Sequence, residues 1–210
     1  MSAVTFPDDI VVPGDLRLTG DITPLKSRSS VLAITELEKF PVPLTLWRVH
    51  DAMQTNLPAS SGDDDLSLVG GTFGTNHPSL QTEDFGGGST TQYARAHIAL
   101  PGNYVAGNTI KLRFSAGMLT TEADNSCTLD VVCYNCDGDT TLHGDGDICG
   151  TAAQDINSLT FADQDFTITA TNLSPGDLLD VRIVIAGTDA GDAGVMKGCI
   201  GQIQLLCDVR

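Results

Sequence analysis

Residues 110–118 read IKLRFSAGM, and this stretch decides the fold class. Ile110, Leu112 and Phe114 share one parity, whereas Lys111 lies on the other. Successive side chains of a β-strand point to opposite faces, so this alternation predicts a strand with one face in a core and the other in solvent.

The same alternation recurs twice nearer the C-terminus. The inward positions would be Leu179, Val181, Ile183 and Ile185 in one stretch, and Cys199, Ile203, Leu205, Cys207 and Val209 in the other. Turn-forming residues separate such stretches at 101–103, 106–108 and 174–177. Several half-buried strands joined by turns predict a mainly β protein with an antiparallel jelly-roll or β-sandwich body.

The charge of the chain is strongly acidic and unevenly distributed. The formal net charge is −16; residues 1–48 hold five basic and six acidic residues, a net of −1, so residues 49–210 carry −15. We therefore expect neither nucleic acid nor an anionic membrane as a partner, because both are bound by basic patches. A solvated surface that keeps the protein soluble explains the excess, and a docking arm with an outward acidic head is compatible with it.

The N-terminus lacks the basic stretch and apolar run of a signal peptide, and no stretch approaches the ~18 apolar residues that span a bilayer. We expect synthesis in a cytosol, where cysteines are more often buried thiols than disulfides. Four of the six cysteines lie at inward positions: Cys127, Cys133, Cys199 and Cys207. Cys133 and Cys136 with His143 and Cys149 resemble zinc spacing, but the second half has one Cys and one His six positions apart, which disfavours zinc.

We expect three segments along the chain. Residues 1–28 form an extended N-terminal arm, residues 29–65 a short helix and linker, and residues 66–210 the jelly-roll body. The helix is expected over Val31–Lys39, because serines precede it as N-caps and a proline follows it. The body boundary follows the run of three aspartates that ends at Asp65.

The arm contains a Gly-Asp-aliphatic unit that recurs at an interval of six residues. Such recurrence is typical of a β-solenoid, but two rungs are too few to fold alone. In a monomer the segment would be a simple extended arm, whereas rungs from other copies would make it an oligomerisation stalk. The residues expected at an oligomer or capsid interface are Gly14, Asp15, Leu16, Leu18, Gly20, Asp21, Ile22, Trp47 and Arg48. Residues 44–49 are expected to form a strand, anchored by Trp47.

No catalytic motif interrupts this scaffold. A Gly-x-Ser-x-Gly elbow is absent, the four histidines are scattered, and the glycine-rich loops at 70–74 and 86–88 lack a phosphate-binding ending. We therefore expect no enzymatic activity, no catalytic residue and no cofactor. An irregular calcium loop could use Asp137, Asp139, Asp145 and Asp147, but the twelfth position of an EF-hand loop is Ile148 here instead of a glutamate, which favours a solvated acidic loop.

Several stretches of the sequence together resemble a group of tailed-phage virion proteins whose bodies look like viral jelly rolls. The stretches are residues 40–44, 47–52, 70–75, 100–107 and 174–182. The similarity covers most of the chain from about residue 30 onward, and its motifs are structural.

The resemblance implies a structural virion protein. It would be a capsid decoration or cement protein that binds the major capsid protein on the outside of a phage head, stabilises capsomer contacts, and self-associates as a homotrimer after synthesis in the host cytoplasm. The alternative is a tail- or fibre-associated receptor-binding or carbohydrate-binding jelly-roll module. Glycan grooves usually present several aromatic side chains, and this chain has 7 Phe, 3 Tyr and 1 Trp, most of them on apolar stripes, which favours the decoration protein.

Overall fold

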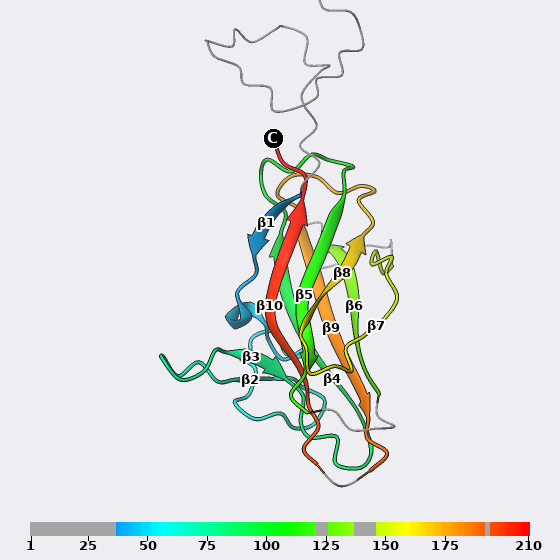
Figure 1. Cartoon of the computed structure of the whole chain (residues 1–210). Coiled ribbons are helices and arrows are strands. Elements are labelled where there is room, and N and C mark those ends of the chain that lie inside the picture. The colour runs from blue at the N-terminus through cyan, green and yellow to red at the C-terminus, as the bar shows by residue number, and fades with distance from the viewer. Residues whose placement is uncertain (1–36, 121–125, 137–145, 192–193) are drawn as a thin grey trace, which may run out of the picture. The chain divides into compact units, whose positions relative to one another are not determined.

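Two antiparallel β-sheets form the β-sandwich of this protein, as Figure 1 shows. The computed structural model describes residues 37–120, 126–136, 146–191 and 194–210. Apart from strands, this part of the chain contains one 3-10 turn, η1 (Leu44–Leu46). No helix among the described residues is long and apolar enough to cross a membrane. The expected mainly β, jelly-roll or β-sandwich body is confirmed.

Sheet A contains six strands and is built around β10. Its order is β2 (Ser67–Val69), β3 (Ser79–Gln81), β10 (Gly198–Cys207), β5 (Ile110–Met118) and β8 (Ala162–Ile168). The sixth strand, β1 (Glu38–Pro41), pairs with the same edge of β10 as β3 does, but farther along it. One long strand therefore holds together segments from both ends of the described chain.

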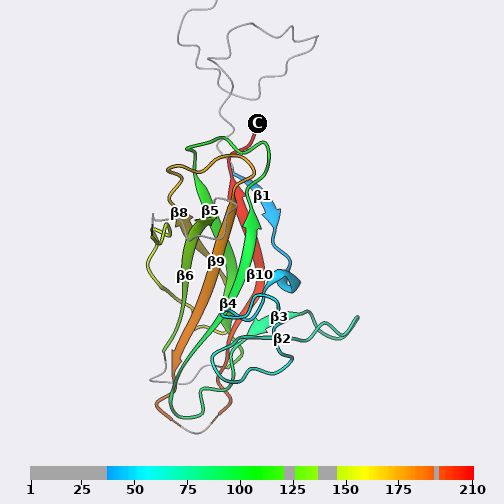
Figure 2. The same cartoon turned by 180° about the vertical axis from the view of Figure 1, so that it is seen from behind.

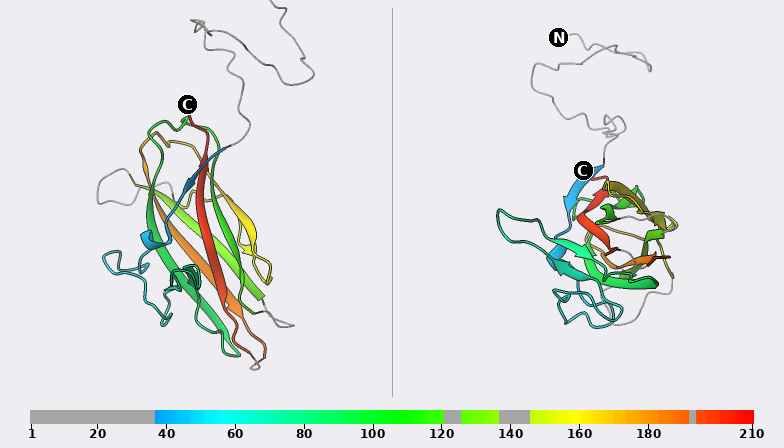
Figure 3. Two further views of the ribbon diagram at one scale, coloured as in Figure 1. Left: turned by 60° about the vertical axis from the view of Figure 1, so that its left-hand side comes forward. Right: turned by 60° about the horizontal axis from the view of Figure 1, so that its bottom comes forward.

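Sheet B contains four strands, and Figure 2 shows it facing the viewer. Its order is β4 (Ser89–Ala99), β9 (Leu178–Thr188), β6 (Ser126–Cys136) and β7 (Gln154–Asp155). The longer strands from β4 to β10 belong in turn to sheets B, A, B, A, B and A, so the chain crosses between the sheets repeatedly. Figure 3 shows the two sheets lying over one another.

The core lies between the inward faces of the two sheets. Phe114 packs edge-on against Phe166, with ring centroids 5.6 Å apart, and Trp47 lies 6.4 Å from Phe114 on its other side. Aliphatic side chains of β9 such as Val181 and Ile183 are fully buried opposite them. The predicted inward parity of residues 110–118 and 179–185 is therefore confirmed.

The alternation in β10 is broken by a β-bulge. Register shifts between Ile200 and Gln202, so that Ile200 pairs with Ala116 whereas Cys199 pairs with Gly117. The prediction that Cys199 shares the parity of Ile203 is therefore wrong, because the extra residue, Gly201, shifts the alternation by one position. Cys199 is nevertheless buried, as are Cys127, Cys133 and Cys207.

All six cysteines are free thiols in this structure. Burial raises the pKa of Cys127 to about 12 and that of Cys207 to about 11. Burial also raises the pKa of Cys133. Of the residues with zinc-like spacing, His143 lies outside the described residues, so the structure does not describe that site as a whole.

The expected short helix differs from the structure where its end is described. Glu38 and Lys39 belong to strand β1, which pairs with Leu206 and its neighbours on β10. A helix of two to three turns is marginal by itself, so pairing with an open sheet edge overrides the local helix propensity. The earlier part of the expected helix lies outside the described residues.

Residues 38–65 belong to the folded unit, which differs from the expected body boundary at Leu66. β1 is a strand of sheet A, and Trp47 is buried in the core with only 1% of its surface exposed. Residues 44–49 are not a strand: η1 opens the segment, and Arg48 alone makes isolated β-bridges, to Asn56 and to Arg95. The run of aspartates is thus a turn inside the body.

The predicted interface residues divide into two groups. Gly14, Asp15, Leu16, Leu18, Gly20, Asp21 and Ile22 lie outside the described residues, as does the whole arm of residues 1–28. Trp47 was wrongly expected at an interface, because the apolar core of the sandwich buries it. Arg48 is half-buried and donates hydrogen bonds to Asn56 and to the Thr45 carbonyl.

The glycine-rich loops connect strands, as expected. Gly70, Gly71 and Gly74 have positive φ in the β2–β3 loop, where other residues would be strained. The calcium residues Asp137, Asp139 and Asp145 lie outside the described residues, whereas Asp147 accepts hydrogen bonds from the backbone N–H groups of Cys133 and Cys149, both at 2.9 Å.

The substitution Gly187→Ala should lower the free energy of unfolding by about 1–3 kcal/mol, because a Cβ on Gly187 would overlap the buried ring of Phe85. Urea denaturation measures this change. The matched control is Gly102→Ala, where a Cβ would meet no atom within 4 Å. Equal stability of the two variants would contradict the close packing of Phe85 on β9.

Candidate functional site

The outer face of sheet B carries a group of polar and aromatic side chains. Inward residues of β4 and β9 such as Ala96 and Val181 are apolar, whereas the opposite parity places Tyr93, Arg95 and His97 on the outer face. Register sets His97 beside Asp180 of β9, and Asp180 beside Tyr134 of β6. The next pair along β4 and β9 sets Arg95 beside Arg182. Pairing therefore gathers residues that are about 40 to 90 positions apart in the chain.

Arg95 and Asp180 form the central ion pair of this face. Nε of Arg95 donates to Oδ1 of Asp180 at 2.6 Å, and Nη2 donates to Oδ2. The hydrogen bond to Asp180 raises the pKa of the Arg95 guanidinium. Because Asp180 is only 8% exposed, this two-point contact fixes both side chains. His97 lies close by, with Nε2 3.6 Å from Oδ1 of Asp180.

Arg182 stacks on an aromatic ring instead of pairing with a carboxylate. Its guanidinium carbon lies 5.2 Å from the ring centroid of Tyr93. His50 stacks on the same tyrosine, with ring centroids 4.7 Å apart. Tyr93 thus contacts the side chains of both Arg182 and His50 with its ring.

His50 comes from the segment that follows η1, and backbone hydrogen bonds fix that segment to the edge of β4. Arg48 and Arg95 exchange N–H···O bonds of 2.9 and 3.1 Å. Leu66 N–H donates to the Tyr93 carbonyl and Tyr93 N–H to the Asp64 carbonyl, both at 2.8 Å. These contacts hold the loop beside the site, so the segment expected as a linker contributes a wall of it.

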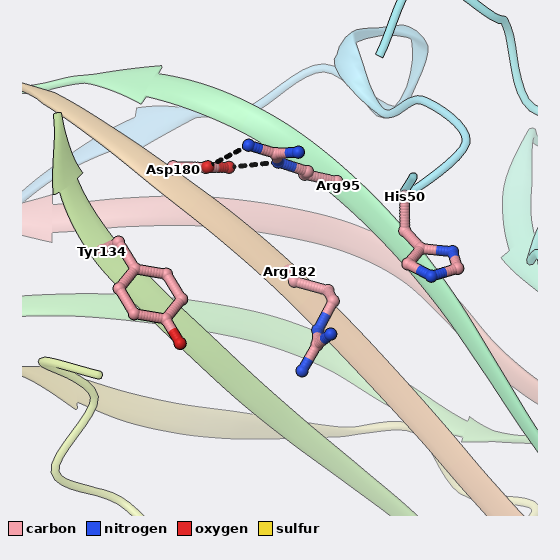
Figure 4. Close-up of a pocket in the computed structure, with 5 residues that line it drawn as sticks. All are labelled: His50, Arg95, Tyr134, Asp180 and Arg182. Carbon is pink, nitrogen blue, oxygen red and sulfur yellow. Dashed lines mark hydrogen bonds and ion pairs between the residues drawn. The ribbon is translucent and has the colours of Figure 1, made fainter. Parts of the chain in front are cut away.

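A pocket of about 190 Å³ opens on this face, and Figure 4 shows the side chains around it. It is lined by His50, Arg95, Tyr134, Asp180 and Arg182. Arg182 lies between Tyr134 and His50, and its guanidinium points away from the Arg95–Asp180 pair (Figure 4). The arrangement offers aromatic faces, a fixed charged pair and one arginine that has no carboxylate partner among the described residues.

Two groups of described residues bring three metal-ligating atoms within 4.8 Å of one another: His97, Cys136 and Asp180, and His50, Asp64 and Asp65. In the first group the Asp180 carboxylate already accepts hydrogen bonds from Nε and Nη2 of Arg95. A metal cation would therefore compete with this guanidinium for the same two oxygens. In the second group the histidine nitrogens lie 3.4 and 3.6 Å from the carboxylate oxygens.

A second pocket, of about 230 Å³, lies on sheet A. Lys39, Lys111, Arg113 and Asp165 line it together with Leu37 and Leu206. Arg113 donates to Asp165 at 2.6 and 2.9 Å, and these bonds lower the pKa of the Asp165 carboxyl. Three cationic side chains and one carboxylate line this pocket, a net charge of +2, and no aromatic side chain is among them, so it lacks the aromatic faces of the sheet B pocket.

None of the residues around the sheet B pocket had been singled out as a site from sequence. The sequence does show that these side chains point outward, because the polar positions of the alternating stretches include Tyr93, Arg95, Asp180 and Arg182. Parity alone cannot show which strands are neighbours, since that depends on register across the sheet.

Comparisons with known proteins find similar β-sandwich structures. A structure of TmCBM61 in complex with β-1,4-galactotriose has 14% identity and a TM-score of 0.42, and the match covers 77% of this chain and 88% of that chain. The second N-terminal cellulose-binding domain from Cellulomonas fimi β-1,4-glucanase C has 16% identity and a TM-score of 0.40, with 85% and 99% covered. The CBM22-1 xylan-binding domain from Paenibacillus barcinonensis Xyn10C has 12% identity and a TM-score of 0.37, with 72% and 86% covered.

Identities and scores this low assign no function to the chain. No protein-family model matches the sequence, and no curated protein matches it significantly. The resemblance to tailed-phage virion proteins therefore stays a hypothesis.

The substitution Asp180→Ala should lower the free energy of unfolding by about 1.5–3 kcal/mol, because it removes two charge-assisted hydrogen bonds and leaves Arg95, whose side chain is 33% exposed, without its partner. Thermal or urea denaturation measures the loss. Asp163→Ala is the matched control: Asp163 pairs with Arg113 at 3.2 Å but is 57% exposed, so its loss should cost at most about 1 kcal/mol. Similar losses in both variants would show that the Arg95–Asp180 pair is not a fixed element of the site.

Proposed function

We propose that this protein is a carbohydrate-binding jelly-roll module whose ligand lies on the outer face of sheet B. The observation that carries the proposal is Tyr134, which lines the pocket of this face beside fixed polar groups, whereas Tyr93 lies on the same face in contact with Arg182 and His50. The proposal assigns binding and no catalytic step to this face.

The chemistry of a sugar fits these side chains. A pyranose ring has apolar C–H faces, which pack on aromatic rings, and hydroxyl groups at its edge, which form hydrogen bonds with planar charged groups. Aromatic side chains supply large contact area at small cost in side-chain entropy. The Arg95–Asp180 pair is held in place before any ligand arrives, so little ordering is needed on binding.

The two tyrosines are well separated on the sheet. Register places Tyr93 beside Val184 and Tyr134 beside Asp180, on the two strands that flank β9. Two strand spacings and four residue rises correspond to roughly 16 Å between their Cα atoms. Because Arg182 and His50 contact Tyr93, Tyr134 is the tyrosine of this face that packs on a sugar ring, and the polar side chains between the two tyrosines can contact neighbouring rings of an oligosaccharide.

A structural role on a phage head is the second candidate, and the β2–β3 loop favours it. Phe73 is fully exposed there, in a turn closed by a 2.9 Å hydrogen bond from the Thr75 N–H to the Thr72 carbonyl. The loop extends away from the sandwich in Figures 1 and 2. Under this second candidate, Phe73 would be the side chain that contacts a capsid protein.

The expected test of the glycan proposal is a glycan array followed by calorimetry. Tyr134→Ala should weaken binding about tenfold, since an aromatic contact contributes about 1–1.5 kcal/mol, whereas Tyr134→Phe should keep most of the affinity. Phe73→Ala is the matched control, because it removes an exposed aromatic side chain remote from the pocket residues in sequence. Absence of any glycan binding, or binding that survives Tyr134→Ala unchanged, would contradict the proposal.

The decoration hypothesis makes a different prediction. If residues 1–28 join copies of the chain, light scattering should give a mass near three times 22.0 kDa for the full chain and near one chain mass after their deletion. A full-length monomer would count against the homotrimer. A trimer that persists after deletion would place the contact in the sandwich.

A further inference from the structure

Arg182 differs from the other arginines of the two sheets in its partners. Arg95 binds Asp180 at two points, and Arg113 binds Asp165 at two points. Arg182 has no carboxylate within ion-pair distance among the described residues, and its one recorded ring contact is the face of Tyr93. It is therefore the arginine of this pocket that is free to bind an anion.

The Nε–H of Arg182 is buried, and no hydrogen-bond partner for it exists within the described structure. A buried donor without an acceptor costs about 1–3 kcal/mol, and one on a charged group costs more. Because Nε has almost no exposed surface, a ligand in the pocket that Arg182 lines would be bound through the terminal Nη groups of the guanidinium.

We infer that the glycan bound by this face contains uronic acid residues, and that Arg182 binds their carboxylate. The inference rests on the proposed function and adds the chemical class of the sugar. A carboxylate accepts two parallel N–H···O bonds from one edge of a guanidinium, such as the edge formed by Nη1 and Nη2. The contact of the guanidinium with the Tyr93 ring restricts the positions that the side chain can take.

A carboxylate fits this pocket better than a sulfate or phosphate group. The second arginine, Arg95, is already neutralised by Asp180, so one free guanidinium matches one planar charge. Tetrahedral anions are usually bound by several donors that surround the group. The other side chains that face Arg182 are Tyr134 and His50, and His50 already lies 3.4 Å from a carboxylate oxygen of Asp65.

The test begins with pairs of glycans. Polygalacturonate, alginate and glucuronoxylan represent acidic glycans, galactan, xylan and mannan represent neutral ones, and fully methyl-esterified polygalacturonate keeps the sugar but lacks the charge. Binding is measured at about 0.15 M salt, where a Debye length of about 8 Å screens repulsion from the net charge of −16. At least one uronate glycan should bind, and its methyl ester should bind at least tenfold more weakly.

Arg182→Gln then separates charge recognition from general binding. It should weaken binding of the acidic glycan about 10- to 100-fold, since hydrogen bonds to charged groups contribute about 1.5–3 kcal/mol, and should change binding of the methyl ester little. The matched control is Arg210→Gln, which removes one exposed positive charge that lines neither pocket. Thermal unfolding of both variants checks that the fold is retained.

Each outcome decides between the two proposals. Binding of neutral or sulfated glycans alone, or equal weakening of the acid and its ester in Arg182→Gln, would overturn the uronate inference and leave a carbohydrate-binding module. No binding to any glycan, or binding that is insensitive to Tyr134→Ala, would overturn the proposed function and the inference together.

Discussion

The structure depends on the pairing of β9 with β4 on one side and with β6 on the other. Both ladders run over the whole length of β9, from Leu178 to Thr188, in continuous register. Because side chains alternate, this one register places an apolar layer inside the sandwich and a polar layer outside it. A slip by a single residue would move both layers to the wrong faces, so stability of the core and geometry of the pocket are set together.

The pocket is accordingly a property of the sheet and of one loop attached to it. Arg95, Tyr134 and Arg182 come from three neighbouring strands, and only His50 comes from a loop. Main-chain hydrogen bonds fix that loop to β4, next to Tyr93, whose ring contacts the His50 ring. Side chains on strands are positioned more rigidly than side chains on free loops, which suits a site that binds without much rearrangement.

Much of the fold could be predicted from the sequence, and little of the site. The alternation in residues 110–118 and 179–185 is strong because each strand has one solvent face, so strand identity and inward residues follow directly. Two features could not be predicted in this way. The bulge at Gly201 has no local sign except the glycine. β1 forms from residues whose local pattern favours a helix, because its stability comes from the distant strand β10.

The sequence alternation showed that the site residues point outward, but it could not show which of them are neighbours. Strand pairing brings together residues up to 87 positions apart, as it does Arg95 and Arg182.

Two short strands, β1 and β3, cover the edge of β10 that does not pair with β5. An uncovered strand edge is a template on which another chain can add by main-chain hydrogen bonds, and proline on the covering strand blocks further growth. Pro41 ends β1 in this position. The four residues Glu38–Pro41 therefore cover the edge of β10 at residues 204–207. A chain that began at the run of aspartates would leave this edge open, and the edge strand of a second sandwich could pair with it.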